Sequence, residues 1–171
     1  MRSAARAEGL SSTQADLLLR VTGHPDERRR VGVLAGELDV SQPTVSDAIA
    51  TLERKGLVER ERGADARAWT LRATRRGRTA AMRLRRWDLQ SRLALAEQPR
   101  EERKRALVFL TSLIASLHDV GLISVARTCP TCRHFRPDRD PGGVPHCALL
   151  DMSLPPERLR VDCPEHELRA A

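Results

Sequence analysis

Aromatic residues are almost missing from this sequence of 171 residues, which contains no tyrosine, two phenylalanines and two tryptophans. Hydrophobic residues still make up 40% of the chain, which is enough for a globular core. That core must be mainly aliphatic, and aliphatic side chains suit helices packed on helices. The length allows one domain, or one domain with a small appendage. We therefore expect a mainly α-helical fold.

Long apolar runs are missing too. No stretch is long enough to cross a bilayer, and the N-terminal MRSAARAEGL lacks the hydrophobic region of a signal peptide. We expect a cytoplasmic protein with no membrane partner, in a compartment where disulfides are rare. The sequence also shows no paired carboxylates, no nucleophile with a base and no phosphate-binding loop, so we do not expect an enzyme.

Lysine is scarce, because Lys55 and Lys104 are the only two and the other basic residues are arginines. Basic residues outnumber acidic ones by 30 to 23, which gives a net charge of +7. The excess is concentrated, since residues 54–87 hold 12 basic and 3 acidic residues. Charge clustered in this way attracts a polyanion through counterion release, and we expect double-stranded DNA. A merely solvated face is the alternative.

Residues 41–56, SQPTVSDAIATLERKG, predict one short helix with two different faces. Ser41 is placed to cap its N-terminus, Pro43 is tolerated in the first turn, and Gly56 suits the C-terminal end. Its apolar side consists of Val45, Ala48, Ile49 and Leu52, at helical spacing. Its polar side, the reading face, consists of Gln42, Thr44, Ser46, Asp47, Thr51 and Arg54. We predict that the reading face enters the major groove of DNA.

The neighbouring segments predict a scaffold for this helix. Helices are expected over 12–21 and 29–38, and Asp39 tolerates the left-handed conformation that so tight a turn between helices requires. This arrangement is a helix-turn-helix. Two strands, 57–62 and 67–72, follow with a turn at 63–66, and they predict a β-hairpin wing.

Two longer helices are expected after the wing. One begins at the cap Thr74 and continues to about Glu97, and the other covers about 100–120. The segment ALVFLTSLIASL in the second helix is apolar around most of its circumference. Such a helix is buried in a core or between two subunits.

These segments resemble the MarR family of winged-helix transcriptional regulators. The resemblance covers about residues 12–120 and depends on LAGELDVSQPTVSDAIATLERKGLVER and DARAWTLRATRRGRTAA. Four wing residues match the family's pattern: Asp65, Arg67, Thr74 and Gly77, with Ala-Thr where the family usually has Leu-Thr.

The resemblance implies a homodimeric repressor that binds a palindromic operator, with half-sites about one helical turn apart. Two recognition helices would enter successive major grooves, and Arg67 at each wing tip would reach the flanking minor groove. Asp47 is unusual on a reading face. It either accepts a hydrogen bond from cytosine N4 or pairs with an arginine such as Arg54.

All four cysteines lie near the C-terminus: Cys129, Cys132, Cys147 and Cys163. A C-x2-C pair followed by two single cysteines can supply four thiolates to one metal centre, and the turn-rich chain between them suits a module stapled by metal. Zn²⁺ is the metal that a cytosolic C-x2-C pair usually binds. An iron–sulfur cluster accepts separated cysteines more readily, and proline follows Cys129 and Cys163, so we favour the cluster. A redox-active pair and unbound thiols are the remaining alternatives.

The sequence thus predicts a flexible N-terminus (1–11), a winged helix-turn-helix (12–78), dimerisation helices (79–121) and a small irregular Cys-rich module (122–171). We expect a sequence-specific transcriptional regulator whose DNA binding is tuned by the metal centre. One alternative is a regulator that responds to a small molecule and carries a purely structural zinc site. A metal or redox protein that uses its winged helix for protein contacts is the other.

Overall fold

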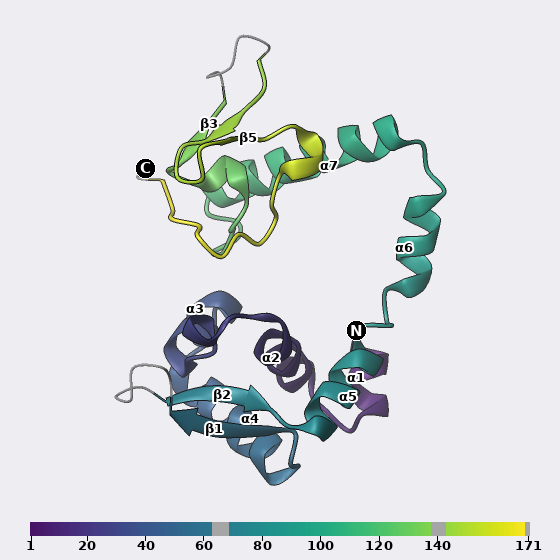
Figure 1. Ribbon diagram of the computed structural model, residues 1–171, viewed down its shortest axis with the longest axis vertical. Coiled ribbons are helices and arrows are strands. Elements are labelled where there is room, and N and C mark those ends of the chain that lie inside the picture. Colours follow the sequence, from purple (N-terminus) through teal and green to yellow (C-terminus); the bar gives the residue numbers. More distant parts are fainter. Residues whose placement is uncertain (63–68, 138–142, 170–171) are drawn as a thin grey trace. The chain divides into compact units, whose positions relative to one another are not determined.

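The computed structural model describes residues 1–62, 69–137 and 143–169. The chain divides into two compact units, Met1–Ala94 and Leu95–Ala171 (Figure 1). The first contains helices and a two-stranded hairpin, and the second a long helix and a three-stranded sheet. The predicted fold class, mainly α with a β-hairpin wing and a small C-terminal module, is confirmed. No helix in the described ranges is both long enough and apolar enough to span a membrane.

The first unit contains a helix-turn-helix followed by a hairpin. Its helices are α1 (Arg2–Ala7), α2 (Ser12–Gly23), η1 (Asp26–Arg28), α3 (Val31–Leu38), α4 (Gln42–Arg54) and α5 (Arg75–Leu84). Strands β1 (Val58–Arg62) and β2 (Trp69–Ala73) pair antiparallel, with Val58 opposite Ala73. The boundary between the two units, after Ala94, falls inside helix α6 (Leu89–Ala96).

Local chemistry sets the ends of the two central helices. Asp39 adopts the left-handed conformation, with φ 53° and ψ 48°, and this single residue turns the chain from α3 into α4. Ser41 then caps α4, because its hydroxyl accepts a hydrogen bond from the Thr44 amide. Both features agree with the predicted helix-turn-helix.

The core of the first unit is aliphatic, as expected. Its largest fully buried side chains come from four helices: Leu17, Leu18, Val21, Leu34, Val45, Ile49, Leu52 and Leu84. Three of these lie on α4 at the predicted spacing, so the apolar side of the helix faces the core. Its polar side is left facing outward.

Residues 1–11 differ from the predicted flexible N-terminus. They contain α1, and Ala5 and Leu10 are buried in the core against α2. Glu8 also forms two hydrogen bonds of 2.6 Å with Arg83 of α5. These contacts order a helix of six residues that would not be stable alone.

The helix predicted from Thr74 to Glu97 is interrupted at residues 85–88. The buried stripe of α5 ends at Leu84, and the next amides, those of Arg86 and Trp87, donate to carbonyls only three residues back. Asp88 precedes α6 and binds Arg92 at 3.0 Å. Helix α6 has no buried residue within the chain, so no packing extends the first helix through this point.

A buried carboxylate links α2, η1 and α3. Glu37 is 7% exposed and contacts three basic side chains: Arg20 and Arg28 at 2.6 Å, and the imidazole of His24 at 2.8 Å. Burial raises the pKa of the Glu37 carboxyl, but hydrogen bonds from Arg28 and His24 outweigh that effect and the net pKa is lowered. The ion cluster therefore fixes the α2–α3 packing when Glu37 is ionised.

Glu37→Gln should destabilise the first unit by about 2–3 kcal/mol at pH 7, because two half-buried arginines lose their anionic partner. Since the folded pKa is lowered, the contribution of Glu37 is fully present above its unfolded pKa and is lost as the pH falls through the folded pKa. The difference between wild type and variant in urea denaturation should thus shrink below about pH 4. Glu97→Gln, at an exposed position, is the control and should have no effect. A wild-type-like midpoint for Glu37→Gln at pH 7 would contradict the assignment.

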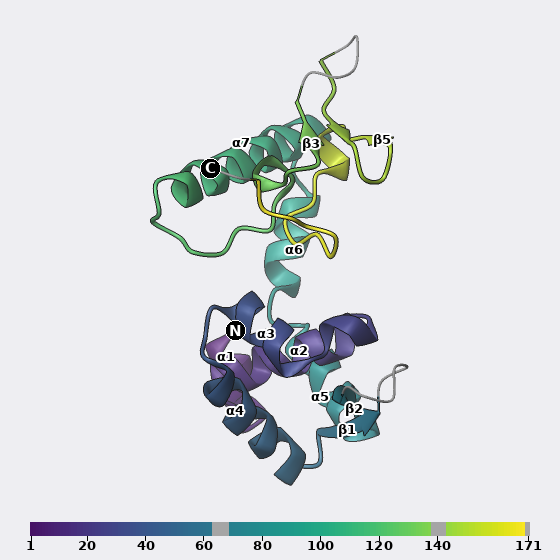
Figure 2. The ribbon, with the colours of Figure 1, turned by 90° about the vertical axis from the view of Figure 1, so that its left-hand side faces the viewer.

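The second unit packs a small sheet beside one long helix, α7 (Arg100–Asp119), as Figures 1 and 2 both show. Short elements follow: η2 (Cys129–Thr131), β3 (Phe135–Arg136), β4 (His146–Cys147), β5 (Met152–Ser153) and η3 (Pro156–Arg158). The three strands are antiparallel in the order β3-β4-β5. Helix α7 confirms the predicted boundaries, but Phe109, Leu110 and Leu113 on it are exposed within the chain.

Candidate nucleic-acid interface and metal centre

The reading face of α4 is accessible. Gln42, Thr44, Asp47 and Arg54 are exposed, whereas Ser46 and Thr51 are half-buried. Hydrogen bonds within the helix order part of this face, because Thr51 Oγ1 donates to the Asp47 carbonyl at 3.0 Å and accepts from Arg54 Nη2 at 2.7 Å. The face therefore offers donors and acceptors at nearly fixed positions, as direct recognition of base edges requires.

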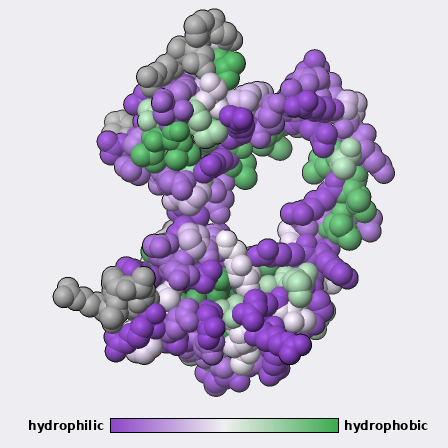
Figure 3. All heavy atoms as spheres, viewed as in Figure 1, coloured by the Kyte–Doolittle hydropathy of each residue, from purple (hydrophilic) through white to green (hydrophobic). Residues whose placement is uncertain are grey.

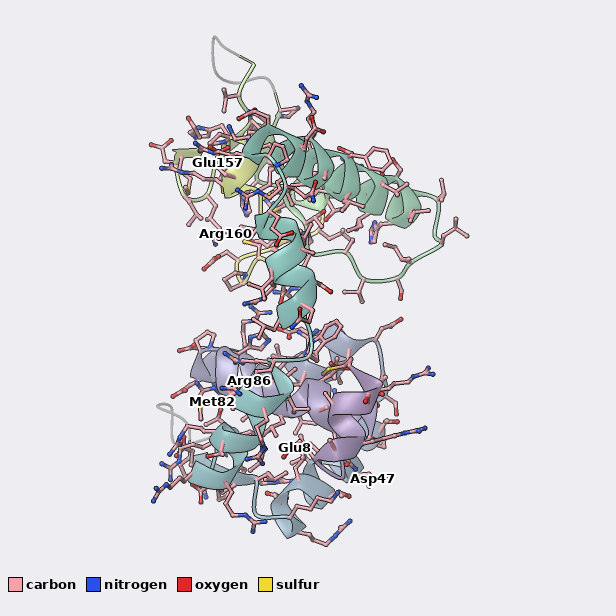
Figure 4. All side chains as sticks on the ribbon, turned by 90° about the vertical axis from the view of Figure 1, so that its right-hand side faces the viewer. Glu8, Asp47, Met82, Arg86, Glu157 and Arg160 are labelled. Carbon is pink, nitrogen blue, oxygen red and sulfur yellow. The ribbon has the colours of Figure 1, made fainter. Side chains whose placement is uncertain are left out.

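Asp47 does not pair with Arg54, whose guanidinium binds Thr51 instead. Among the described residues, the Asp47 carboxylate has no salt-bridge partner, and Figure 4 shows it on the outside of the first unit. A free carboxylate on this face is available to accept a hydrogen bond from cytosine N4.

The wing is braced by charged side chains on both strands. Arg72 of β2 binds Glu59 at 2.6 Å and Glu61 at 2.8 Å, and the Arg62 guanidinium lies 4.5 Å from the centre of the Trp69 ring. Arg67, predicted to reach the minor groove, lies outside the described residues, as does Asp65.

Thr74 and Gly77, which matched the family's wing pattern, have structural roles. Thr74 caps α5 by accepting from the Gly77 amide at 3.0 Å, and its hydroxyl donates to the Gly56 carbonyl at 2.7 Å. Gly77 leaves no room for a side chain, because a Cβ there would lie 1.9 Å from the carbonyl oxygen of Leu57. The two residues hold the start of α5 against the chain that leaves α4.

The four cysteines surround one small cavity, the cysteine pocket. Its remaining walls include the apolar side chains of Phe135, Leu149, Leu150 and Leu154, together with His134 and Glu165. All four cysteines are free thiols. No group of three or more His, Cys, Asp or Glu in the described ranges forms a set that could already hold a metal ion. The fold therefore gathers the four predicted ligands without bringing them to ligand geometry.

Arg160 contacts two of these sulfurs. Its amide donates to Cys129 Sγ at 3.2 Å, and its Nη1 donates to Cys163 Sγ at 3.7 Å. Burial raises the pKa of both thiols, although the Arg160 amide acts in the opposite direction on Cys129. The sequence analysis did not predict a role for Arg160. The sole signal for it in the sequence is that it lies three residues before Cys163.

The three histidines near the cysteines have other partners. His134 Nε2 lies 3.2 Å from Glu167, His146 Nε2 lies 3.1 Å from Asp151, and His166 Nε2 lies 2.9 Å from the Thr131 hydroxyl. The Nε2 atoms of these histidines are therefore engaged in other contacts. The thiols, which are the softest donors around the cysteine pocket, remain as the candidate metal ligands.

Comparison with known proteins shows what the first unit is similar to. Residues 8–68 match the sequence model of the MarR family. Among solved structures, the S. aureus MepR–DNA complex has a TM-score of 0.58 with 21% identity and covers 68% of this chain and 84% of MepR. FabT of Streptococcus pneumoniae in complex with DNA has a TM-score of 0.57 with 26% identity and covers 67% of this chain and 80% of FabT.

A third similar structure is S. aureus MepR bound to ethidium bromide, with a TM-score of 0.53, 23% identity and coverage of 67% and 84% of the two chains. A search of curated proteins finds no match to this chain. The first unit thus has the winged helix-turn-helix fold of these structures, and residues 8–68 are similar in sequence to the MarR family.

Proposed function

We propose that this protein is a sequence-specific, DNA-binding transcriptional repressor. The observation that supports this function best is α4, whose apolar side is fixed in the core while its reading face is exposed and partly ordered by hydrogen bonds. A helix held in this way can enter a major groove and contact base edges without losing its own support. The DNA complexes of MepR and FabT have the same fold.

The exposed apolar side chains on the two helices after the wing support a homodimer. Leu89, Leu93 and Leu95 of α6 are 45–58% exposed, and Figure 3 shows hydrophobic atoms gathered over this helix. Phe109 of α7 is 65% exposed. A second copy of the chain would cover such surfaces, and two-fold symmetry then requires a palindromic operator.

We further propose that the cysteine pocket holds a metal centre with Cys129, Cys132, Cys147 and Cys163 as ligands. The donor set suits an iron–sulfur cluster or Zn²⁺ by its chemistry, because four thiols line one pocket and amide and guanidinium donors face two of the sulfurs. A bound centre would stabilise the module and supply a signal that tunes DNA binding. A small-molecule effector with purely structural zinc is the second candidate, since MepR binds ethidium.

Thr44→Ala should weaken operator binding roughly tenfold, because it removes one base-edge contact worth about 1–2 kcal/mol. Arg67→Ala should cause a similar loss through the flanking minor groove. Fluorescence anisotropy on an operator selected from a random-sequence library measures both effects. Ser91→Ala, an exposed position on α6, is the control. If both variants bind as wild type does, the recognition helix and wing are wrongly assigned. Absence of selective binding by wild type would reject the function itself.

A further inference from the structure

A strongly basic cleft lies within the first unit, between the C-terminal end of α4, one side of α5 and the end of α1. Its volume is about 730 Å³. The basic cleft is lined by Glu8, Arg54, Lys55, Leu57, Arg75, Arg76, Thr79, Ala80 and Arg83. Five of these nine residues are cationic and one is acidic, so the walls favour a ligand with several negative charges.

The single carboxylate in the cleft is already neutralised. Glu8 receives two hydrogen bonds of 2.6 Å from Arg83, which lowers the pKa of Glu8. The Lys55 ammonium donates to the Gly9 carbonyl, which leaves its charge uncompensated. The guanidinium groups of Arg75 and Arg76 have no hydrogen-bond or ion-pair partner among the described residues. The cleft thus contains a net positive charge that the protein itself does not balance.

Arg54 connects this cleft with the reading face. Asp47, Thr51 and Arg54 follow one another at helical spacing, and hydrogen bonds join Thr51 to both neighbours. Arg54 is also a wall of the basic cleft. Arg54 thus links the proposed reading face with the same cleft wall that contains Arg75 and Arg76.

We propose that the basic cleft binds backbone phosphates of the DNA strand that borders the major groove read by α4. This inference rests on the proposed function and adds a phosphate contact outside the recognition helix and the wing. One guanidinium group can donate two parallel hydrogen bonds to the oxygens of one phosphate. Two neighbouring arginines therefore suit consecutive phosphates of one strand. Contacts of this kind position the protein on the duplex without selecting a sequence.

The test is the salt dependence of binding to a random-sequence duplex. Each phosphate contact contributes about 0.9 to the slope of log K against log salt, so Arg75→Ala with Arg76→Ala should reduce the magnitude of the slope by nearly 2. Affinity at low salt should fall similarly on random and selected duplexes. The matched control is Arg85→Ala with Arg86→Ala, which removes the same charge about 15 Å further along the chain after α5 (Arg86 is labelled in Figure 4).

An unchanged slope for the Arg75/Arg76 variant, or an equal reduction in the control, overturns the inference. Calorimetry with pyrophosphate tests whether the cleft binds the phosphates of DNA or a free phosphate-containing anion. If the Arg75/Arg76 variant loses pyrophosphate binding but keeps the wild-type slope on DNA, the cleft is a small-anion site and the DNA assignment is wrong. Failure of the proposed function would give a different result. The wild-type protein would show no selective operator binding, and Thr44→Ala would not change DNA affinity.

Discussion

Cys129→Ser is expected to abolish metal binding and to unfold the Cys-rich module. The module has almost no core of its own, since its strands are two residues long and, among its described residues, the buried apolar side chains are those of Ala126, Cys129 and Leu154. In such segments the free energy of metal binding is largely the free energy of folding, about 10 kcal/mol for structural zinc. Metal analysis, sulfide analysis and absorbance after anaerobic purification measure the first effect, and limited proteolysis measures the second.

His134→Ala is the matched control, because His134 lines the same pocket but has Glu167 as its partner. It should keep the metal content of wild type. Iron with sulfide and visible absorbance identifies a cluster, whereas a colourless protein with one zinc per chain identifies zinc. A wild-type module that is folded and free of metal would contradict the proposed centre.

Gly77→Ala is expected to unfold the winged helix at physiological temperature, with a loss of about 3 kcal/mol or more. The added Cβ would lie 1.9 Å from the Leu57 carbonyl oxygen and 2.9 Å from its carbonyl carbon. Both are backbone atoms, so relief requires α5 to move away from β1 and breaks the bonds that Thr74 makes there. Thermal unfolding should show the melting temperature lowered by about 12 °C or more.

Gly36→Ala tests whether this loss comes from the contact rather than from the change of residue. Gly36 is also helical, but it is exposed and a Cβ there would have no atom within 4 Å. Replacing it should stabilise α3 by about 0.5–1 kcal/mol. Equal behaviour of the two variants would show that Gly77 is not a close-contact position.

The helix-turn-helix could be predicted from local signals. Apolar residues on α4 recur at helical spacing, Ser41 is a strong cap, and Asp39 tolerates the left-handed turn. The break after Leu84 could not be predicted, because Trp87 and Leu95 prolong the apolar pattern although both are more than half exposed. A periodic sequence shows which face of a helix is apolar, but it does not show whether a partner surface exists.

The functional surfaces were partly predictable for the same reason. The spacing of the cysteines indicated a common site, and the structure lines one cavity with all four. Arg160 and the basic cleft depend on contacts between distant segments, such as Glu8 with Arg83, which are 75 residues apart. No local pattern encodes such pairs, so they became visible only in three dimensions.

Helix η3 and the residues after it join α7 to the proposed metal ligands. Glu157 binds Arg100 of α7 at 2.9 Å, and Arg160, three residues later, contacts Cys129 and Cys163 (both residues are labelled in Figure 4). By thermodynamic linkage, any coupling between two sites acts equally in both directions. If the metal alters the arrangement of α7, then a partner subunit bound to α7 alters metal affinity by the same factor. A protomer that loses its partner would consequently release its metal at a different free concentration from a dimer.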